Sequence, residues 1–391
     1  MKVAVVSEYY PRAHDSVLGV WAHRQALAAR DAGADVRVLV LYRPVPPLST
    51  APRDFLREAR RLSRHPLRRT LDGIEVEYVR FVSPPRPRSY GSWGAWAAPS
   101  VAVALRRLRR RFPFDLVHAH NAVPAGDAVL RARIRAPLVV SVHGSDVFHT
   151  APDHTDGRAA VTRAFRSARL VLANSAGIEQ ACRELGAPRT RVLRLGTDLP
   201  HAPPGPRGRF DPVLVTVAHL IHRKRHADVI RALWALRERH PTLRYVVIGD
   251  GPEREPLRAL ATQLGVADRV ELAGQLPHDE ALRRARECSV FVMPSVDEAF
   301  GVAYVEAMAA CLPAIGCRGE PGPEEIAGAG EGMQLVPPGD VEELAGAIDA
   351  LVRDPGEVRA VGARARATVE AAFTWERCGR ETVRAYEDAV R

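Results

Sequence analysis

The sequence predicts an α/β protein made of two doubly wound units, and three observations support this fold class. Apolar runs of strand length alternate with helical patterns before and after residue 200. A segment rich in proline and glycine, residues 201–210, separates the two series and indicates a linker. At 391 residues, the chain is also long for a single hydrophobic core. We therefore expect an N-terminal unit over residues 1–200 and a C-terminal unit over residues 211–372.

The N-terminal series begins with a strand at residue 2 and alternates from there. Gly33 is expected to close the first helix, and Ser175 to cap a later one, because glycine and serine are typical of those positions. We expect strands over residues 2–7, 34–41, 72–82, 115–120, 138–142, 170–174 and 191–195, and helices over residues 23–32, 52–63, 94–111 and 175–185.

The same alternation restarts after the linker. Pro355 is expected to end a helical segment, and Thr374 to cap a final helix within residues 373–391. We expect strands over residues 213–217, 244–248, 270–272 and 290–293, and helices over residues 227–240, 253–264, 279–287, 300–311 and 341–352.

The most informative stretch is residues 289–316, SVFVMPSVDEAFGVAYVEAMAACLPAIG, which predicts a strand, a loop and a helix. In a parallel sheet, ligands bind at the carboxyl ends of strands, so the loop and the helix start should line a site. Free N–H groups at a helix start suit a phosphate. The carboxylates of Glu298 and Glu306 instead suit hydroxyl groups. Together these preferences fit a diphosphate between two sugars, as in a nucleotide sugar.

These residues resemble the E-x7-E signature of the retaining family-4 glycosyltransferases of the GT-B fold, here running from Glu298 to Glu306. The resemblance implies two Rossmann-like lobes facing across a cleft, with the last helix, residues 373–391, crossing back to the first lobe. Cys311 departs from the pattern, because the family usually has glycine there. The implied roles are donor-sugar binding by Glu298, Ala299 and Phe300, ribose binding by Glu306, and diphosphate binding by the backbone at Gly301, Val302 and Ala303.

A basic loop follows the first strand of the C-terminal unit. Lys224 is the only lysine after residue 2 in an arginine-rich chain, which indicates that a compact point charge is needed there. The resemblance implies that Arg223 and Lys224 bind the donor diphosphate. His219 stands where the family has arginine. In the N-terminal unit, the resemblance places Gly19 near the same diphosphate, although a turn requirement explains a lone glycine equally well.

Histidines gather at the expected strand ends of the N-terminal unit. His118 and His120 alternate onto one face of their strand, but no third ligand lies at a familiar spacing, so no metal site is expected. His120 is instead expected to line the site. His143 follows the next strand in the segment HGSD, and the resemblance implies that it contacts the donor sugar, with Asp146 nearby. The expected catalytic residues are thus His143, Lys224 and Glu298.

The composition limits the classes of partner. The formal charge of +10 would attract anionic partners, although a general bias towards arginine and alanine explains it as well. No G-x-G-x-x-G fingerprint is present, so we expect no dinucleotide cofactor. The expected partner is a nucleotide sugar rather than a nucleic acid, with a UDP-sugar favoured over a GDP- or ADP-sugar. A strand at residue 2 and no apolar run of about 18 residues predict a cytoplasmic protein. Its five cysteines are expected to be reduced.

Residues 52–63 predict a basic amphipathic helix, and residues 93–111 repeat the combination of an apolar stretch with an arginine cluster. Such a surface would suit the anionic face of a membrane and, with it, a lipid-linked acceptor. In the alternative, both apolar faces pack on the sheet and the arginines are solvated. In the first helix, Arg53, Arg57, Arg60 and Arg64 fall on one side, and Phe55, Leu56, Ala59 and Leu62 on the other.

The expected reaction is retaining, metal-independent transfer of a sugar from a nucleotide diphosphate to a hydroxyl acceptor. Two other classes stay open at this point. One is a sugar-nucleotide epimerase, and the other is an inactive nucleotide-sugar-binding module on the same scaffold. The base, the sugar, the acceptor, the linkage and the oligomeric state are not specified by the sequence.

Overall fold

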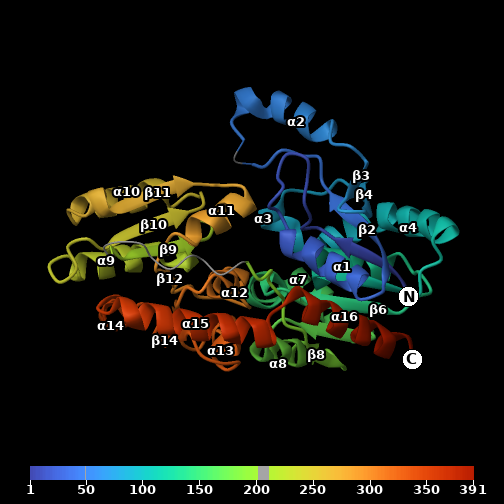
Figure 1. Ribbon diagram of the computed structural model, residues 1–391. Coiled ribbons are helices and arrows are strands. Elements are labelled where there is room, and N and C mark those ends of the chain that lie inside the picture. The colour runs from blue at the N-terminus through green and yellow to red at the C-terminus, as the bar shows by residue number, and fades with distance from the viewer. Residues whose placement is uncertain (49, 201–210) are drawn as a thin grey trace. The chain divides into compact units, whose positions relative to one another are not determined.

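The computed structural model describes residues 1–48, 50–200 and 211–391, and the chain divides into two compact units (Figure 1). Unit 1 comprises Met1–Arg194 together with Trp375–Arg391, and unit 2 comprises Leu195–Thr374. The linker predicted over residues 201–210 lies outside the described residues. Each unit is built on one sheet flanked by helices, as the fold prediction required.

Unit 1 contains an eight-stranded sheet that is parallel except for the antiparallel pair β3 and β4. The strand order reverses between β1 and β5, and this reversal is the place where doubly wound sheets bind ligands. The order is β3 (Arg68–Leu71), β4 (Ile74–Arg80), β2 (Asp35–Tyr42), β1 (Lys2–Ser7), β5 (Leu116–His120), β6 (Leu138–Val142), β7 (Leu170–Ala173) and β8 (Thr190–Val192).

The helices of unit 1 form two packed groups. Helix α1 packs against α16, and α4, α5 and α7 pack together. The Tyr386 hydroxyl of α16 shares a 2.8 Å hydrogen bond with Nδ1 of His118 on β5, so the last helix joins the first unit as expected. The helices are α1 (Val20–Asp31), α2 (Phe55–Ser63), α3 (Arg86–Ser89), α4 (Trp93–Arg111), α5 (Asp127–Arg131), α6 (Ala151–Asp153), α7 (Thr155–Ser167), α8 (Ala176–Glu184) and α16 (Trp375–Val390).

Unit 2 contains a six-stranded, fully parallel sheet whose order reverses between β9 and β12. Its strands are buried among aliphatic residues of α9 and α14. The order is β11 (Val270–Gly274), β10 (Arg244–Ile248), β9 (Val213–Val217), β12 (Val290–Val292), β13 (Ala314–Cys317) and β14 (Met333–Val336), and the helices are α9 (His226–Ala235), α10 (Arg254–Gln263), α11 (His278–Ala285), α12 (Val302–Ala309), α13 (Pro321–Ala327), α14 (Val341–Val352) and α15 (Pro355–Ala372).

Two expectations about where helices begin or end are wrong. Pro355 begins α15 rather than ending a segment, because proline fits the first helical position, where no N–H partner is needed. The Asp354 carboxylate caps this helix by accepting the N–H of Gly356 at 2.7 Å. Helix α1 also starts three residues earlier than expected, at Val20 instead of residue 23. The Ser175 cap is confirmed, since its hydroxyl accepts the N–H of Ile178.

Cys311 keeps the backbone geometry that a glycine would adopt. It follows α12 with a φ of 62°, in the left-handed region that costs an L-residue about 1–2 kcal/mol. The departure from the family pattern therefore adds local strain and leaves the course of the chain into β13 intact. All five cysteines lie within the described residues, and none forms a disulfide there.

Candidate active site

The candidate ligand-binding edge of the sheet in unit 2 lies where the strand order reverses. Strands β9 and β12 are hydrogen-bonded neighbours and run parallel, so the loops that follow them leave the sheet at the same edge. The loop after β9 carries Arg223 and Lys224, and the loop after β12 carries Ser295 and Glu298. The sheet thus brings together basic and acidic residues from segments about seventy residues apart, at the position that ligands occupy in this architecture.

Lys224 and Glu298 form a buried ion pair, with 2.5 Å between Nζ and Oε2. The Ser295 hydroxyl donates to the same carboxylate oxygen at 2.9 Å, and Arg223 Nη1 lies 3.8 Å from it. Burial alone would raise the pKa of Glu298, but Lys224 and Arg223 bring it below its ordinary value, so the carboxylate is ionised. Burial lowers the pKa of Lys224, and Glu298 opposes that shift.

The start of α12 completes this edge. Gly301 precedes the helix with a φ of 82°, and no described side chain caps it. A Cβ at Gly301 would lie 2.4 Å from the Tyr304 ring, so only glycine fits this approach. The first-turn residues Val302 and Ala303 follow directly, while Ala299 and Phe300 are buried before it.

Glu306 and His219 lie outside the Lys224–Glu298 cluster. Glu306 is one turn into α12, and its Oε1 lies 3.5 Å from Nε2 of His278 on α11. His219 is exposed, and its Nδ1 lies 3.0 Å from the Asp250 carbonyl oxygen. Sequence reasoning missed Glu320, whose carboxylate accepts the Glu298 N–H at 2.9 Å and holds the loop in place. A residue that acts on a backbone amide across the fold leaves no local sequence signal.

In unit 1, Gly19 is explained by close packing. It precedes α1 with a φ of 65°, and a Cβ there would lie 2.2 Å from the Tyr9 carbonyl carbon. Two residues later, the Trp21 ring packs 4.0 Å from the ring of His143, measured between centroids. Gly19 therefore sets the start of the helix that carries a neighbour of His143.

The histidines separate into a structural one and a pair. His118 has both ring nitrogens occupied, by Tyr386 and by the Ser141 hydroxyl at 2.7 Å. His120 and His143 stack, and His120 Nδ1 lies 2.9 Å from His143 Nε2. Burial lowers the pKa of His120 to about 3 and that of His143 well below its usual value, so both rings are neutral at pH 7. No group of three metal-ligating side chains gathers anywhere in the described residues.

Asp146 holds the loop after β5. Its carboxylate accepts the N–H groups of Ala122 at 2.7 Å and Val123 at 3.1 Å. Burial raises its pKa to about 7, although these two hydrogen bonds oppose the shift. The side chain predicted to join the site is therefore occupied with the backbone, and its direct effect is on the position of that loop.

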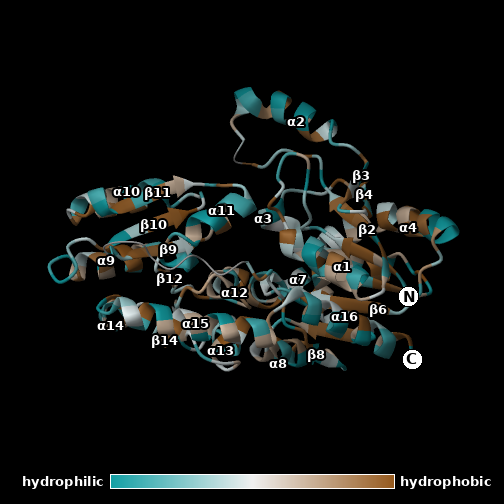
Figure 2. Cartoon of the chain, in the orientation of Figure 1, coloured by the Kyte–Doolittle hydropathy of each residue, from teal (hydrophilic) through white to brown (hydrophobic). Residues whose placement is uncertain are grey.

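A basic and apolar surface lies elsewhere on unit 1. In α2, Phe55 and Leu56 are 45% and 69% exposed, and α2 stands away from the sheet (Figures 1 and 2). The alternative in which both apolar stretches pack on the sheet is thus wrong for the start of α2, whereas Leu62 near its end is buried and its carbonyl accepts the Tyr42 hydroxyl of β2 at 2.8 Å. The same alternative is correct for much of α4, where Trp93 is buried but Trp96 remains 50% exposed.

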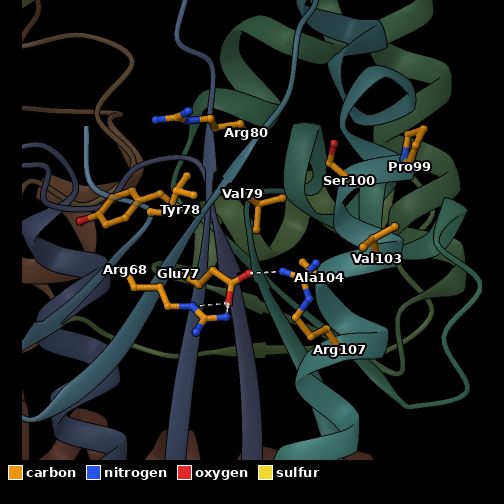
Figure 3. A pocket seen from close by; sticks show the side chains of 11 residues that line it. Arg68, Glu77, Tyr78, Val79, Arg80, Pro99, Ser100, Val103, Ala104 and Arg107 are labelled. Carbon is orange, nitrogen blue, oxygen red and sulfur yellow. Dashed lines mark hydrogen bonds and ion pairs between the residues drawn. The ribbon is translucent and has the colours of Figure 1, made fainter. Parts of the chain in front are cut away.

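A cavity of about 750 Å³ lies between β3, β4 and α4. Figure 3 shows Arg68 and Arg107 directed at Glu77 in this cavity. Arg111 also lies 3.3 Å from Glu77, so three arginines share one carboxylate and positive charge is in excess. No helix in the described ranges combines the length and apolar character needed to cross a membrane.

Comparison with known proteins identifies the class. Among solved structures, sucrose-phosphate synthase from Thermosynechococcus elongatus superposes with a TM-score of 0.77 at 20% identity, over 99% of this chain and 98% of that one. Anabaena HepE in complex with UDP superposes with a TM-score of 0.72 at 21% identity, over 99% and 100%. Together with the two doubly wound units, these similarities define the GT-B fold.

The family follows from sequence. Residues 17–201 match the family "Glycosyltransferase Family 4", and residues 206–368 match "Glycosyl transferases group 1". The 2-deoxystreptamine glucosyltransferase of Streptomyces kanamyceticus is 30% identical over 75% of this chain and 83% of its own length. A GDP-mannose-dependent phosphatidylinositol monomannoside mannosyltransferase of Mycolicibacterium smegmatis is 30% identical over 68% and 75%. The chain belongs to the family-4 glycosyltransferases.

Proposed function

We propose that this glycosyltransferase takes its sugar from a nucleotide diphosphate and transfers it to a hydroxyl acceptor with retention of configuration. The observation that carries the proposal is the buried Lys224–Glu298–Ser295 cluster beside the start of α12. A departing nucleoside diphosphate gains negative charge. In this proposal Lys224, Arg223 and the N–H groups at Gly301 to Ala303 stabilise it in place of a metal ion.

Glu298 has a different part in the proposed reaction. Its ionised carboxylate accepts hydrogen bonds and so suits the hydroxyls of the donor sugar. An incoming diphosphate would compete with Glu298 for Lys224, which couples binding of the donor to rearrangement of this pair. The family relatives favour transfer over the epimerase, and an inactive binding module remains as an outcome of the experiments below.

The identity of the nucleotide can be tested first. A ligand present at 100 times its dissociation constant stabilises the folded protein by about 2.7 kcal/mol. Thermal unfolding with UDP, GDP and ADP should therefore single out one base, for which UDP is the favoured candidate. Release of the free diphosphate from the corresponding sugar conjugate then separates an enzyme from a binding module, which would bind without release.

The two glutamates of α12 and its preceding loop should differ in effect. Glu306→Ala is expected to weaken binding of the nucleoside diphosphate by about tenfold, because a ribose contact is lost. Glu298→Ala should not weaken that affinity, because it removes a competitor for Lys224, and should lower turnover instead. Calorimetric titration and rates of diphosphate release measure the two effects, and Glu342→Ala, on the exposed side of α14, serves as the control. Wild-type affinity in Glu306→Ala would remove Glu306 from the ribose site.

We also propose that unit 1 lies on an anionic membrane in the cytoplasm and that the acceptor is lipid-linked. The exposed Phe55 and Leu56 beside the arginines of α2 support this, as does the excess of arginine around Glu77. Each arginine near such a surface contributes about 1 kcal/mol.

Liposome sedimentation tests the membrane proposal. The protein should pellet with vesicles containing phosphatidylserine at low salt, and stay in the supernatant with neutral vesicles or at high salt. The double variant Phe55→Glu/Leu56→Glu should lose this binding, whereas Trp234→Glu, at an exposed apolar position of α9 in unit 2, should keep it. Equal recovery in the supernatant with both kinds of vesicle would contradict the proposal.

A further inference from the structure

A groove runs between α4 and the β3 end of the sheet in unit 1. The cavity of about 750 Å³ described above continues into a second hollow of about 520 Å³, because Arg68 and Glu77 line both. Both volumes lie in the range of about 300–1,000 Å³ that is usual for sites of small molecules. Strand β2 separates β4 from β1, so the groove lies apart from the reversal of strand order where doubly wound sheets bind their ligands.

Small side chains on α4 leave this space open. Ser100 and Ala104 are four residues apart, so they lie on one side of the helix, and both line the cavity together with Val79 of β4 (Figure 3). Protein interiors are normally close-packed, and a helix that packs fully on a sheet leaves no hollow of this size. The first part of the groove is therefore a preformed space with a mostly apolar lining.

Large apolar side chains at this part of the groove remain in contact with water. Leu67 and Val103 line it and are 52% and 53% exposed. Trp96, also half exposed, lies two turns before Val103 on the same side of α4. Apolar surface gains about 25 cal/mol for each Å² that is removed from water, so an apolar chain would be stabilised along this side of the helix.

The other part of the groove is basic. Arg68, Arg107 and Arg111 surround Glu77, so three guanidinium groups share one carboxylate and two positive charges are in excess. The three arginine side chains are exposed, whereas Glu77 is largely buried beneath them. The second hollow is lined in addition by Arg37, Arg69 and Glu75.

The two parts together define the class of ligand. Exposed guanidinium groups bind phosphate through pairs of parallel hydrogen bonds, and they need an anion to balance their charge. A free inorganic anion would leave the apolar part of the groove in water, and a neutral lipid would leave the arginines unbalanced. An anionic amphiphile, with an apolar chain and a phosphate head, satisfies both parts.

We propose that the groove between β3, β4 and α4 binds one molecule of an anionic phospholipid. Its phosphate lies among Arg68, Arg107 and Arg111, and one acyl chain runs past Val103 towards Trp96. The inference rests on the proposed membrane contact of unit 1 for the source of this lipid. It adds a defined site that holds a single lipid molecule, away from the exposed start of α2.

Three soluble probes test the chemistry of the site by calorimetry. Dodecyl phosphate, used below the concentration at which it forms micelles, should bind with one molecule per chain. Inorganic phosphate and the neutral dodecyl maltoside should each bind at least tenfold more weakly, and salt should weaken the binding of dodecyl phosphate. Equal affinity for inorganic phosphate or for dodecyl maltoside would overturn the proposal, because one part of the groove would then have no effect.

Ser100→Leu places the site in the groove. The larger side chain fills the hollow beside α4, so the variant should unfold at the same or a higher temperature while losing at least tenfold in affinity for dodecyl phosphate. A mutation that acted only by damaging the fold would lower both quantities. Wild-type affinity in a folded Ser100→Leu variant would overturn the proposal.

Two changes of charge test the basic part in opposite directions. Arg68→Gln/Arg107→Gln should lose at least tenfold in affinity for dodecyl phosphate. The control Arg158→Gln/Arg166→Gln removes the same charge from the exposed side of α7 in unit 1 and should bind as the wild type does. Glu77→Gln should bind at least threefold more tightly, because the phosphate no longer competes with a carboxylate for the arginines. Equal effects of the two double variants would contradict a local site.

The same variants separate this inference from the proposed function. Phe55→Glu/Leu56→Glu should lose vesicle binding and keep the wild-type affinity for dodecyl phosphate, since α2 does not line the groove. Ser100→Leu should keep the wild-type affinity for the nucleoside diphosphate. If the wild type ignores vesicles but binds dodecyl phosphate in this pattern, the membrane contact fails and the lipid site stands. If it binds vesicles but not dodecyl phosphate, the lipid site fails and the membrane contact stands.

Discussion

Lys224→Ala is expected to slow diphosphate release by on the order of 100- to 1,000-fold, the usual loss when one group that stabilises developing charge is removed. The substitution should also destabilise unit 2, by about 3–5 kcal/mol at most, because it leaves the buried Glu298 without its closest cation. Lys224→Arg should restore only part of the rate, since a planar guanidinium does not replace a point charge. Single-turnover rates and denaturant unfolding measure the two effects.

The double variant Lys224→Met/Glu298→Gln separates catalysis from stability. It removes both buried charges, so the free energy of unfolding should return towards the wild-type value while turnover stays low.

The pH dependence of stability provides a second control. The folded-state pKa of Glu298 is lowered, so its contribution to stability is present above the ordinary pKa of a glutamate and is lost as the pH falls through the folded value. Lys224→Ala turnover within twofold of wild type would exclude Lys224 from the site.

Gly19→Ala is expected to destabilise unit 1 by about 3 kcal/mol or more, because left-handed strain adds to a clash with backbone. The new Cβ would lie 2.2 Å from the Tyr9 carbonyl carbon, and neither segment is a flexible side chain that can move aside. The start of α1 would shift, and with it Trp21 against His143. Chemical unfolding measures the loss of stability.

Gly33→Ala is the matched control for Gly19→Ala. Gly33 has a φ of 101°, but no atom lies within 4 Å of the position that a Cβ would take. It should therefore show the backbone strain alone, about 1–2 kcal/mol. Equal losses in the two variants would mean that the loop at Tyr9 adapts, and that packing is not what requires glycine at residue 19.

Much of the fold was predictable, because buried parallel strands are short apolar runs between turn residues. The strands at Lys2–Ser7 and Leu138–Val142 have the predicted bounds. Pro355 was misinterpreted because proline both ends helices and begins them, and only the cap formed by Asp354 decides between the two. The exposed face of α2 was not predictable either. Periodicity shows that a helix has an apolar side, but not what covers that side.

The candidate site was predictable where one segment carries it. Glu298, Gly301 and Glu306 belong to a single strand–loop–helix stretch, so their spacing was visible in the sequence. The contact of Glu298 with Lys224 depends on which strands are neighbours, which periodicity does not give.

The return of α16 to unit 1 has a consequence for the order in which the two units fold during synthesis. Strand β5 needs Tyr386 for His118, yet all of unit 2 (Leu195–Thr374) is translated between these two partners. At roughly 5–20 residues per second, the ribosome imposes a delay on the order of 10 s or more. During that time the nascent first unit has neither α16 against α1 nor the hydroxyl that pairs with His118, and the sequence of unit 2 is complete at Thr374, before α16 is made. The second unit can therefore fold before the first is finished.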